Sequence, residues 1–202
     1  MNEHYFTTQP SRYTRYTRDV HILGTEYAVS TSAGVFSAGG LDIATAVFLD
    51  KVPLDTLPDN SRVLDVGCGW GPLSLALAQT YPHAELWATD TNEQARVLTR
   101  ENLRNAGLSG NVCSPEEAFS KLAPASVDML WSNPPIRIGK TALHQLLLDN
   151  LRLLKKDGNA YLVVGKNLGA DSLTVWLQEQ GYGCEKIGSS KGFRVLHVHL
   201  KS

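Results

Sequence analysis

The sequence predicts an α/β protein in which helices cover both faces of a mostly parallel β-sheet. From residue 61 onward, short apolar stretches alternate with helical patterns, the order that right-handed crossovers between parallel strands produce. The first apolar stretch runs into a glycine-rich turn, VLDVGCGWG, and the second ends at Asp90. Ligands of open α/β sheets bind at the carboxyl ends of strands, so these two segments mark a candidate site.

The first 50 residues are expected to form an extension, made of an arm, a hairpin and a helix, that packs on a core of residues 51–202. Residues 20–31 have the pattern of a β-hairpin that turns near Gly24 and Thr25, and residues 41–50 have the pattern of a helix. Arg12, Arg15 and Arg18 alternate with tyrosines before the hairpin. This segment is either an RNA-contacting arm or an ordinary surface strand or frayed terminus.

Seven strands are expected in the main sheet, at residues 62–66, 85–89, 111–113, 127–131, 159–164, 183–187 and 192–200. Helix signals lie between them: Pro72 suits a first helical turn, Thr91 has capping-box spacing to Gln94, and Gly107 suits a left-handed C-terminal cap. Leucines from residue 143 to 154 repeat at helical spacing. The last two strands are joined by SSKG, too short for a crossover helix, so they should pair antiparallel at one edge of the sheet.

Length and composition predict one domain of ordinary globular character, with 202 residues, 43% hydrophobic and 19% charged. The net charge of −1 argues against a globally basic nucleic-acid-binding protein, although residues 135–202 carry ten Lys and Arg against five Asp and Glu. With no apolar run of about 20 residues and no signal-peptide pattern, a cytoplasmic protein is expected. The three cysteines are expected to be buried hydrophobes, and no metal site is predicted.

The glycine-rich turn favours a cofactor without a pyrophosphate. Its glycines follow GxGxG, whereas the nicotinamide fingerprint requires GxGxxG and Pro72 occupies that sixth position. A carboxylate just before the glycines, Asp65, suits the ammonium and sulfonium groups of S-adenosylmethionine. Asp90 is placed to accept both ribose hydroxyls, or is simply an acidic residue at a helix N-terminus. Glu116 or Glu117, with Phe119, is expected near the adenine; both acids are equally consistent with a solvated turn.

The fourth strand of the predicted sheet ends in Asn-Pro-Pro, which restricts the backbone at residues 133–135. This rigid corner presents the side-chain oxygen of Asn133 and the carbonyl of Pro134. Two such acceptors can take both hydrogens of an –NH2 group, which frees the nitrogen lone pair and stabilises the positive charge that develops on nitrogen during alkylation. The motif therefore predicts transfer to an exocyclic amine without a strong base.

Together, these motifs resemble class I N-methyltransferases, which have a Rossmann-like sheet. HYFTTQP, GVFSAGGLDIAT, NPPIRIGK, LGADSL and KGFRVL extend the resemblance over the whole chain to the small-domain methyltransferases related to the bacterial 16S ribosomal RNA guanine-N2 methyltransferase, and to a single-domain branch of them. The resemblance implies a catalytic segment of Asn133, Pro134, Pro135 and Ile136. It implies an S-adenosylmethionine site made of Phe36, Asp42, Asp65, Gly67, Cys68, Gly69, Asp90, Thr91, Glu117, Ala118 and Asn133.

The chain departs from the family at Ile136, where many members carry an aromatic residue that stacks on the flipped base. Phe193 or Trp131 is the alternative stacking partner. Arg137, Lys140, Lys166 and Arg194 are candidate phosphate contacts of an RNA substrate. The expected function is N-methylation of a nucleobase, with guanine N2 of ribosomal RNA first. Methylation of protein glutamine or DNA adenine, and a non-catalytic RNA-binding module, are the alternatives.

Overall fold

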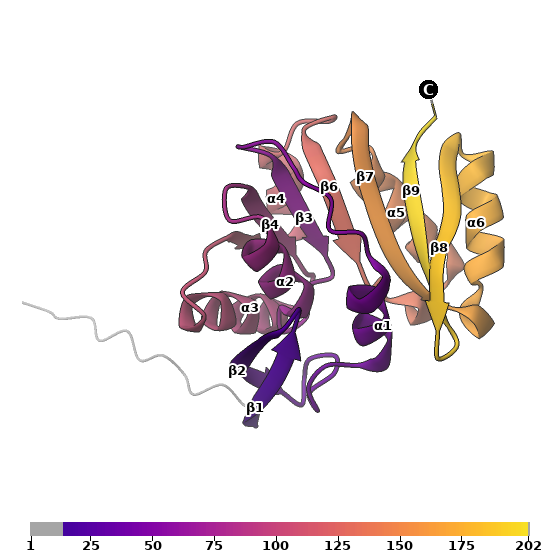
Figure 1. Cartoon of the computed structure of the whole chain (residues 1–202). Helices are drawn as coiled ribbons and strands as arrows, with labels where there is room; N and C mark the ends of the chain where they lie inside the picture. Colours follow the sequence, from indigo (N-terminus) through magenta and orange to yellow (C-terminus); the bar gives the residue numbers. More distant parts are fainter. Residues whose placement is uncertain (1–13, 202) are drawn as a thin grey trace, which may run out of the picture.

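The computed structural model describes residues 14–201 as a β-hairpin packed against a sheet with helices on both faces (Figure 1). The hairpin consists of β1 (Arg15–Ile22) and β2 (Thr25–Ser32). The main sheet consists of β3 (Arg62–Val66), β4 (Glu85–Thr89), β5 (Asn111–Cys113), β6 (Val127–Ser132), β7 (Leu154–Gly165), β8 (Tyr182–Ser190) and β9 (Phe193–Leu200). The helices are α1 (Ile43–Lys51), α2 (Pro72–Thr80), α3 (Glu93–Asn105), α4 (Pro115–Lys121), α5 (Lys140–Leu151) and α6 (Ala170–Glu179), with 3-10 turns η1 (Ile136–Ile138) and η2 (Lys166–Leu168).

The main sheet has the order β5-β4-β3-β6-β7-β9-β8. The pairs from β5 to β7 are parallel, and β9 pairs antiparallel with both β7 and β8. The predicted doubly wound α/β fold with an antiparallel end is therefore confirmed. The reversed strand, β9, lies one place in from the edge, because the short turn sends the chain back between β8 and β7.

Two apolar clusters hold the layers together, one on each face of the sheet. The first packs α1, α2, α3 and the hairpin on residues such as Val63 and Trp131, and the second packs α4, α5 and α6 on residues such as Leu64 and Leu130 (Figure 1). Successive residues of a strand face opposite sides of the sheet, so one strand contributes side chains to both clusters. Across the described residues, no helix combines the length and apolar character needed to cross a membrane.

The hairpin is fastened to the core by Asn102 of α3, whose side chain is buried. Its Oδ1 accepts from Ser30 N at 2.7 Å, and its Nδ2 donates to the carbonyls of Ser30 and Trp70 at 2.9 and 2.7 Å. Arg15 of β1 pairs with Glu101, also on α3. Arg15 is thus engaged by the core, while Arg12 of the expected arm lies outside the described residues.

Three local predictions were wrong by a few residues. The hairpin turns at Leu23 and Gly24, so that Ile22 pairs with Thr25. Asn92 rather than Thr91 caps α3, accepting from Gln94 N at 2.9 Å. Leu154, expected in a helix, begins β7. It is buried in the same apolar cluster as the leucines of α5, so the helical spacing of leucines continues past the end of the helix.

Candidate cofactor and acceptor site

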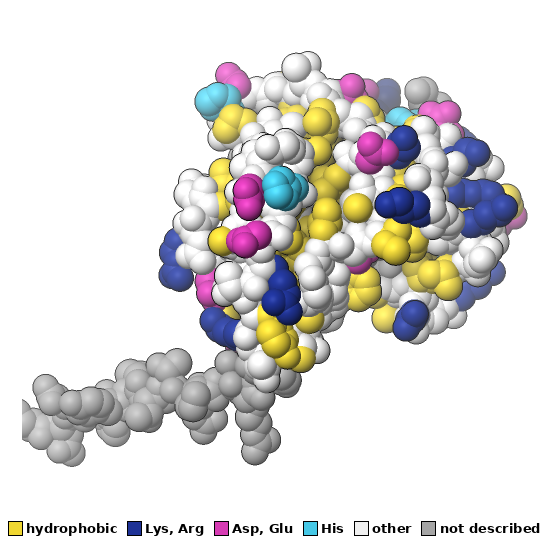
Figure 2. All heavy atoms as spheres, turned by 60° about the horizontal axis from the view of Figure 1, so that its bottom comes forward, with side chains coloured by type: hydrophobic (Ala, Val, Ile, Leu, Met, Phe, Trp, Pro, Cys, Tyr) yellow, Lys and Arg dark blue, Asp and Glu magenta, His cyan; other side chains and the backbone are white. Residues whose placement is uncertain are grey.

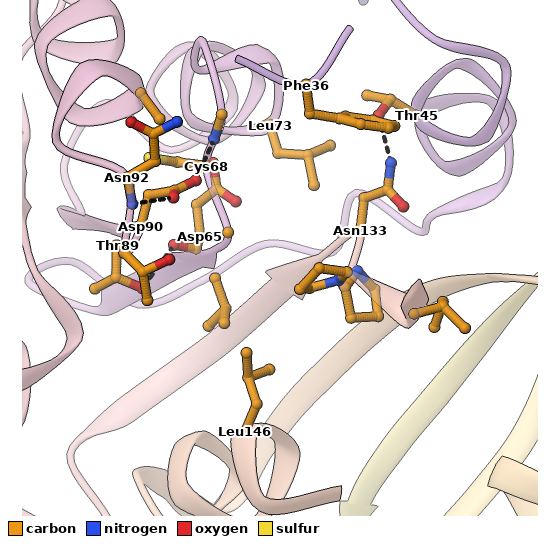
Figure 3. Close-up of a pocket in the computed structure, with 18 of the residues that line it drawn as sticks. Phe36, Thr45, Asp65, Cys68, Leu73, Thr89, Asp90, Asn92, Asn133 and Leu146 are labelled. Carbon is orange, nitrogen blue, oxygen red and sulfur yellow. Dashed lines mark hydrogen bonds between the residues drawn. The ribbon is translucent and has the colours of Figure 1, made fainter. Parts of the chain in front are cut away.

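A cavity of about 760 Å³ opens at the carboxyl ends of β3, β4, β6 and β7. The start of α1 and the loop before it close one side of the cavity, and α5 contributes Leu146 to another (Figure 3). This volume lies within the range of small-molecule sites, roughly 300–1,000 Å³. The cavity brings together the glycine-rich turn, the acid after β4 and the Asn-Pro-Pro corner, which the sequence predicted to form one site.

The glycine-rich turn follows the end of β3 and has a left-handed backbone conformation that residues with a side chain rarely adopt. Gly67, Gly69 and Gly71 have φ values of 79°, 59° and 97°. The amides of Gly67 and Cys68 donate to the carbonyl of Thr89 at 2.8 and 2.9 Å, which ties this turn to the end of β4. Gly67, Cys68 and Gly69 all line the cavity.

Asp65 is a buried carboxylate with one unpaired oxygen. Its exposed fraction is 0%, Ser74 donates to Oδ2 at 2.6 Å, and Oδ1 has no hydrogen-bond partner. Burial, with the nearby charge of Asp90, raises the pKa of Asp65 to about 7. A buried acceptor of this kind lacks a donor, and an ammonium group in the cavity would supply one while restoring the ionised form.

Asp90 connects the turn that follows β3 with the turn that follows β4. Its Oδ2 accepts from Gly69 N at 3.0 Å and its Oδ1 accepts from Asn92 N at 2.8 Å. Each carboxylate oxygen can accept a second hydrogen bond, so the group remains able to take two hydroxyls. Thr91 and Asn92 also line the cavity here, and the sequence had not singled out Asn92.

At the expected adenine end, the structure favours Glu116 over Glu117. Glu117 Oε2 accepts from Ser114 N at 2.9 Å in a capping box, and neither Glu117 nor Ala118 lines the cavity. Glu116 and Phe119 do line it. Hydrogen bonds from the backbone and from Ser114 lower the pKa of Glu116, which keeps this acid ionised as an acceptor. The structure therefore favours Glu116 near the adenine, because the capping box directs Glu117 elsewhere, and the assignment of Glu117 and Ala118 to the site stays a prediction.

The Asn-Pro-Pro corner presents its acceptors to the same cavity (Figure 3). Asn133 Nδ2 donates to Thr45 Oγ1 at 3.1 Å and lies 3.4 Å from Asp42 Oδ1. The Pro134 carbonyl accepts from Ile136 N at 2.8 Å across Pro135, whose φ of −73° and ψ of 79° make an inverse γ-turn. One lone pair of that carbonyl is thereby used, the corner is stiffened, and the second lone pair remains.

The residues around the corner are mainly apolar. Phe36, which is 70% exposed, extends over the cavity near Thr45 and Asn133 (Figure 3). Ile136 and Phe193 also line the cavity. Trp131 does not, because it is fully buried between Phe48 and Tyr81 with edge-on contacts. Of the two alternative stacking partners, the structure leaves Phe193.

The four predicted cations are not equivalent. Arg137 is exposed and lines the cavity, whereas Lys140 lines a smaller neighbouring hollow and Lys166 is exposed beside the site. Arg194 is ion-paired with Asp171. Asp171, on α6, therefore shares the charge of Arg194, whose role as a phosphate contact stays a prediction.

Comparison with known proteins identifies the family. A family model described as the methyltransferase small domain matches residues 26–197. The chain belongs to the methyltransferase small-domain family. S-adenosylmethionine is the cofactor of this family, and Asp65, with its unpaired oxygen beside the glycine-rich turn, provides an anionic group that its ammonium can meet.

Similar proteins include ribosomal RNA methyltransferases. The chain is 28% identical over 198 residues to the Bacillus subtilis protein YbxB, covering 97% of this chain and 98% of that protein. It is 35% identical over 170 residues to ribosomal RNA small subunit methyltransferase C of Pseudomonas entomophila, covering 82% of this chain and 48% of the relative. It thus spans about half the length of that relative.

A solved structure shows the same fold. The Thermus thermophilus 16S rRNA N2 G1207 methyltransferase, in complex with AdoMet and guanosine, has a TM-score of 0.78 at 23% identity and is matched over 93% of this chain and 51% of that one. The fold and cofactor predicted from the sequence are confirmed, and the chain belongs to a methyltransferase family and is similar to ribosomal RNA methyltransferases.

Proposed function

We propose that this protein methylates an exocyclic amino group of a nucleobase, with guanine N2 of ribosomal RNA as the leading acceptor. The observation that carries the proposal is that the buried Asp65 and the Asn133–Pro134 corner line one cavity. An electrophilic methyl group is the chemistry that S-adenosylmethionine supplies when bound. The rest of the reaction consists of holding the amine in line with that group.

The corner residues do this without a base. The oxygen of Asn133 and the free lone pair of the Pro134 carbonyl accept the two N–H groups of the amine, which turns the nitrogen lone pair away from conjugation and toward the methyl group. The same acceptors stabilise the positive charge that grows on nitrogen. The amine loses its proton to solvent after transfer, so no residue of the chain has to remove it beforehand.

The nucleobase assignment is supported by the surroundings of the corner. Phe193, Ile136 and Phe36 line the cavity and offer apolar contact to a planar ring. In Figure 2, which brings the carboxyl ends of the parallel strands forward, hydrophobic side chains follow a central groove and Lys and Arg gather on the side of the C-terminal third. Arg137, Lys140 and Lys166 are exposed and suit a phosphate backbone.

The experiment is transfer of a radiolabelled methyl group to total RNA, ribosomal subunits, DNA and protein in parallel. We expect label in RNA or ribosomal subunits, and label eluting as a methylated guanine after nucleoside digestion. Label in DNA or in a protein glutamine would replace the proposed acceptor. Failure to label any of them, by a preparation that binds S-adenosylmethionine, would contradict the proposal.

A further inference from the structure

Two residues of the N-terminal segment hold the Asn133 amide in a single orientation. Asp42 is the N-cap of α1: its Oδ1 accepts from Ala44 N at 2.9 Å and from Thr45 N at 3.1 Å. The Thr45 hydroxyl donates to Asp42 Oδ2 at 2.5 Å. Thr45 is buried, and its Oγ1 lies 3.1 Å from Asn133 Nδ2.

The direction of each hydrogen bond in this chain follows from a count of protons. A threonine hydroxyl has one proton, and here the carboxylate takes it. Toward Asn133 the hydroxyl can therefore only accept, so the atom facing it must be the amide nitrogen. Asp42 Oδ1, 3.4 Å from the same nitrogen, favours the same orientation. The amide oxygen of Asn133 is consequently left for the cavity.

We propose that Thr45 and Asp42 are positioning residues that act through Asn133, fixing its amide oxygen as an acceptor for the substrate amine. This inference rests on the proposed function. A carboxylate that accepts from the hydroxyl also strengthens the bond that the hydroxyl accepts, which draws electron density toward the Asn133 oxygen. The N-terminal segment thus completes the acceptor corner, although it lies about 90 residues before the motif in the chain.

Three substitutions separate the direction of these hydrogen bonds from the stability of α1. Thr45→Val keeps the shape and removes the hydroxyl, while Thr45→Ser restores it. Asp42→Asn keeps an N-cap, since asparagine caps helices as well as aspartate. Its oxygen must face the two helix amides, so its NH2 group donates to Thr45. The Thr45 proton then turns toward Asn133 and reverses that amide, which presents its NH2 group to the substrate amine.

The test combines steady-state methyl transfer, cofactor titration and proton NMR of side-chain amides, with Asn133→Ala as the reference variant. We expect Thr45→Val to lower kcat about 100-fold, as loss of one preorganised hydrogen-bonding group does. Cofactor Kd should stay within about threefold, and Thr45→Ser should recover most of kcat. Asp42→Asn should lower kcat at least as much as Thr45→Val. Combining Thr45→Val with Asn133→Ala should lower kcat no further than Asn133→Ala alone.

The outcomes distinguish this inference from the proposed function. If Asn133→Ala is inactive while Thr45→Val and Asp42→Asn keep wild-type kcat, the positioning role is wrong and the function stands. If Asn133→Ala keeps wild-type turnover, the function fails. In that case the positioning role of Thr45 and Asp42 is decided by the NMR signals of the Asn133 side-chain amide protons, which are identified by their absence from the spectrum of Asn133→Ala. Thr45→Val should shift them and speed their exchange, and an unchanged signal would refute the relay. Should Thr45→Val not fold, Asp42→Asn carries the same comparisons, because it reverses the hydrogen bond of the Thr45 hydroxyl without removing it.

Discussion

Replacing Asp65 by asparagine should make the cofactor-free protein more stable and nearly unable to bind S-adenosylmethionine. Asparagine has almost the same shape, and its oxygen can still accept from Ser74, which donates to Asp65 at 2.6 Å. Its NH2 group then occupies the position of Oδ1, the oxygen that has no partner. A buried charge is removed, and a donor faces the place where the ammonium group of the cofactor would donate.

The magnitude follows from the pKa of Asp65, which burial raises from 3.8 to about 7. One pKa unit corresponds to about 1.4 kcal/mol, so ionising this carboxyl in the folded protein costs on the order of 4 kcal/mol. The folded state holds the proton more tightly than the unfolded state. Stability from this group is therefore present below about pH 4, declines as the pH rises, and is lost above about pH 7. Asparagine does not titrate, so its advantage should grow over that window.

Urea unfolding of the cofactor-free protein at pH 5 and pH 8 measures this difference. Asp65→Asn should gain roughly 1–2 kcal/mol over wild type at pH 5 and roughly 4 kcal/mol at pH 8. Calorimetric titration should show cofactor affinity weakened about 100-fold or more, as loss of a buried charged partner does. The exposed Asp59→Asn is the control and should change the free energy of unfolding by less than about 0.5 kcal/mol. An Asp65→Asn protein less stable than wild type at pH 8, or one with unchanged cofactor affinity, would contradict this role of Asp65.

Two further predictions concern the hairpin and the basic side of the groove. Asn102→Ala leaves three backbone groups of Ser30 and Trp70 without their partner, so the free energy of unfolding should fall by roughly 2–4 kcal/mol in a urea titration. Asn105, on the same helix, is exposed, so Asn105→Ala should leave the free energy of unfolding unchanged, and equal effects of the two variants would contradict the anchoring role of Asn102. Arg137→Glu should weaken binding to ribosomal RNA several-fold at low salt, with a shallower salt dependence, in a filter-binding assay. Lys156→Glu, exposed near the start of β7, should not, and a matching loss there would indicate a non-specific charge effect.

Much of the fold could be predicted because its signals are local. The strands 62–66 and 85–89 were bounded correctly, since each is a short apolar run that stops at a turn residue or an acid. The prolines of Asn-Pro-Pro restrict their own backbone and the glycines permit the tight turn after β3, so the place of both motifs in the site also followed from the sequence. Helix ends were harder: buried leucines continue past the end of α5 into β7, and spacing alone does not mark where the backbone changes.

Contacts between segments that are distant in the chain could not be predicted from the sequence. The ion pair between Arg194 of β9 and Asp171 of α6 joins two separate elements, and no spacing rule predicts it. Nor does any rule bring Thr45 to Asn133, although Thr45 stands three residues after a good helix N-cap, where hydroxyls often bond the cap. The sequence does contain a signal that separates Glu116 from Glu117, because Ser114 and Glu117 have capping-box spacing.

The central claim is that the Asn133 corner delivers an exocyclic amine to the methyl group of S-adenosylmethionine. Nucleoside mass spectrometry of ribosomal RNA incubated with isotope-labelled cofactor and either wild-type protein or Asn133→Ala tests it most directly. We expect a labelled methyl group on an exocyclic base nitrogen with the wild type, and its near absence with the variant at saturating cofactor. Label on a ring carbon or a ribose oxygen, or equal labelling by the two proteins, would contradict it.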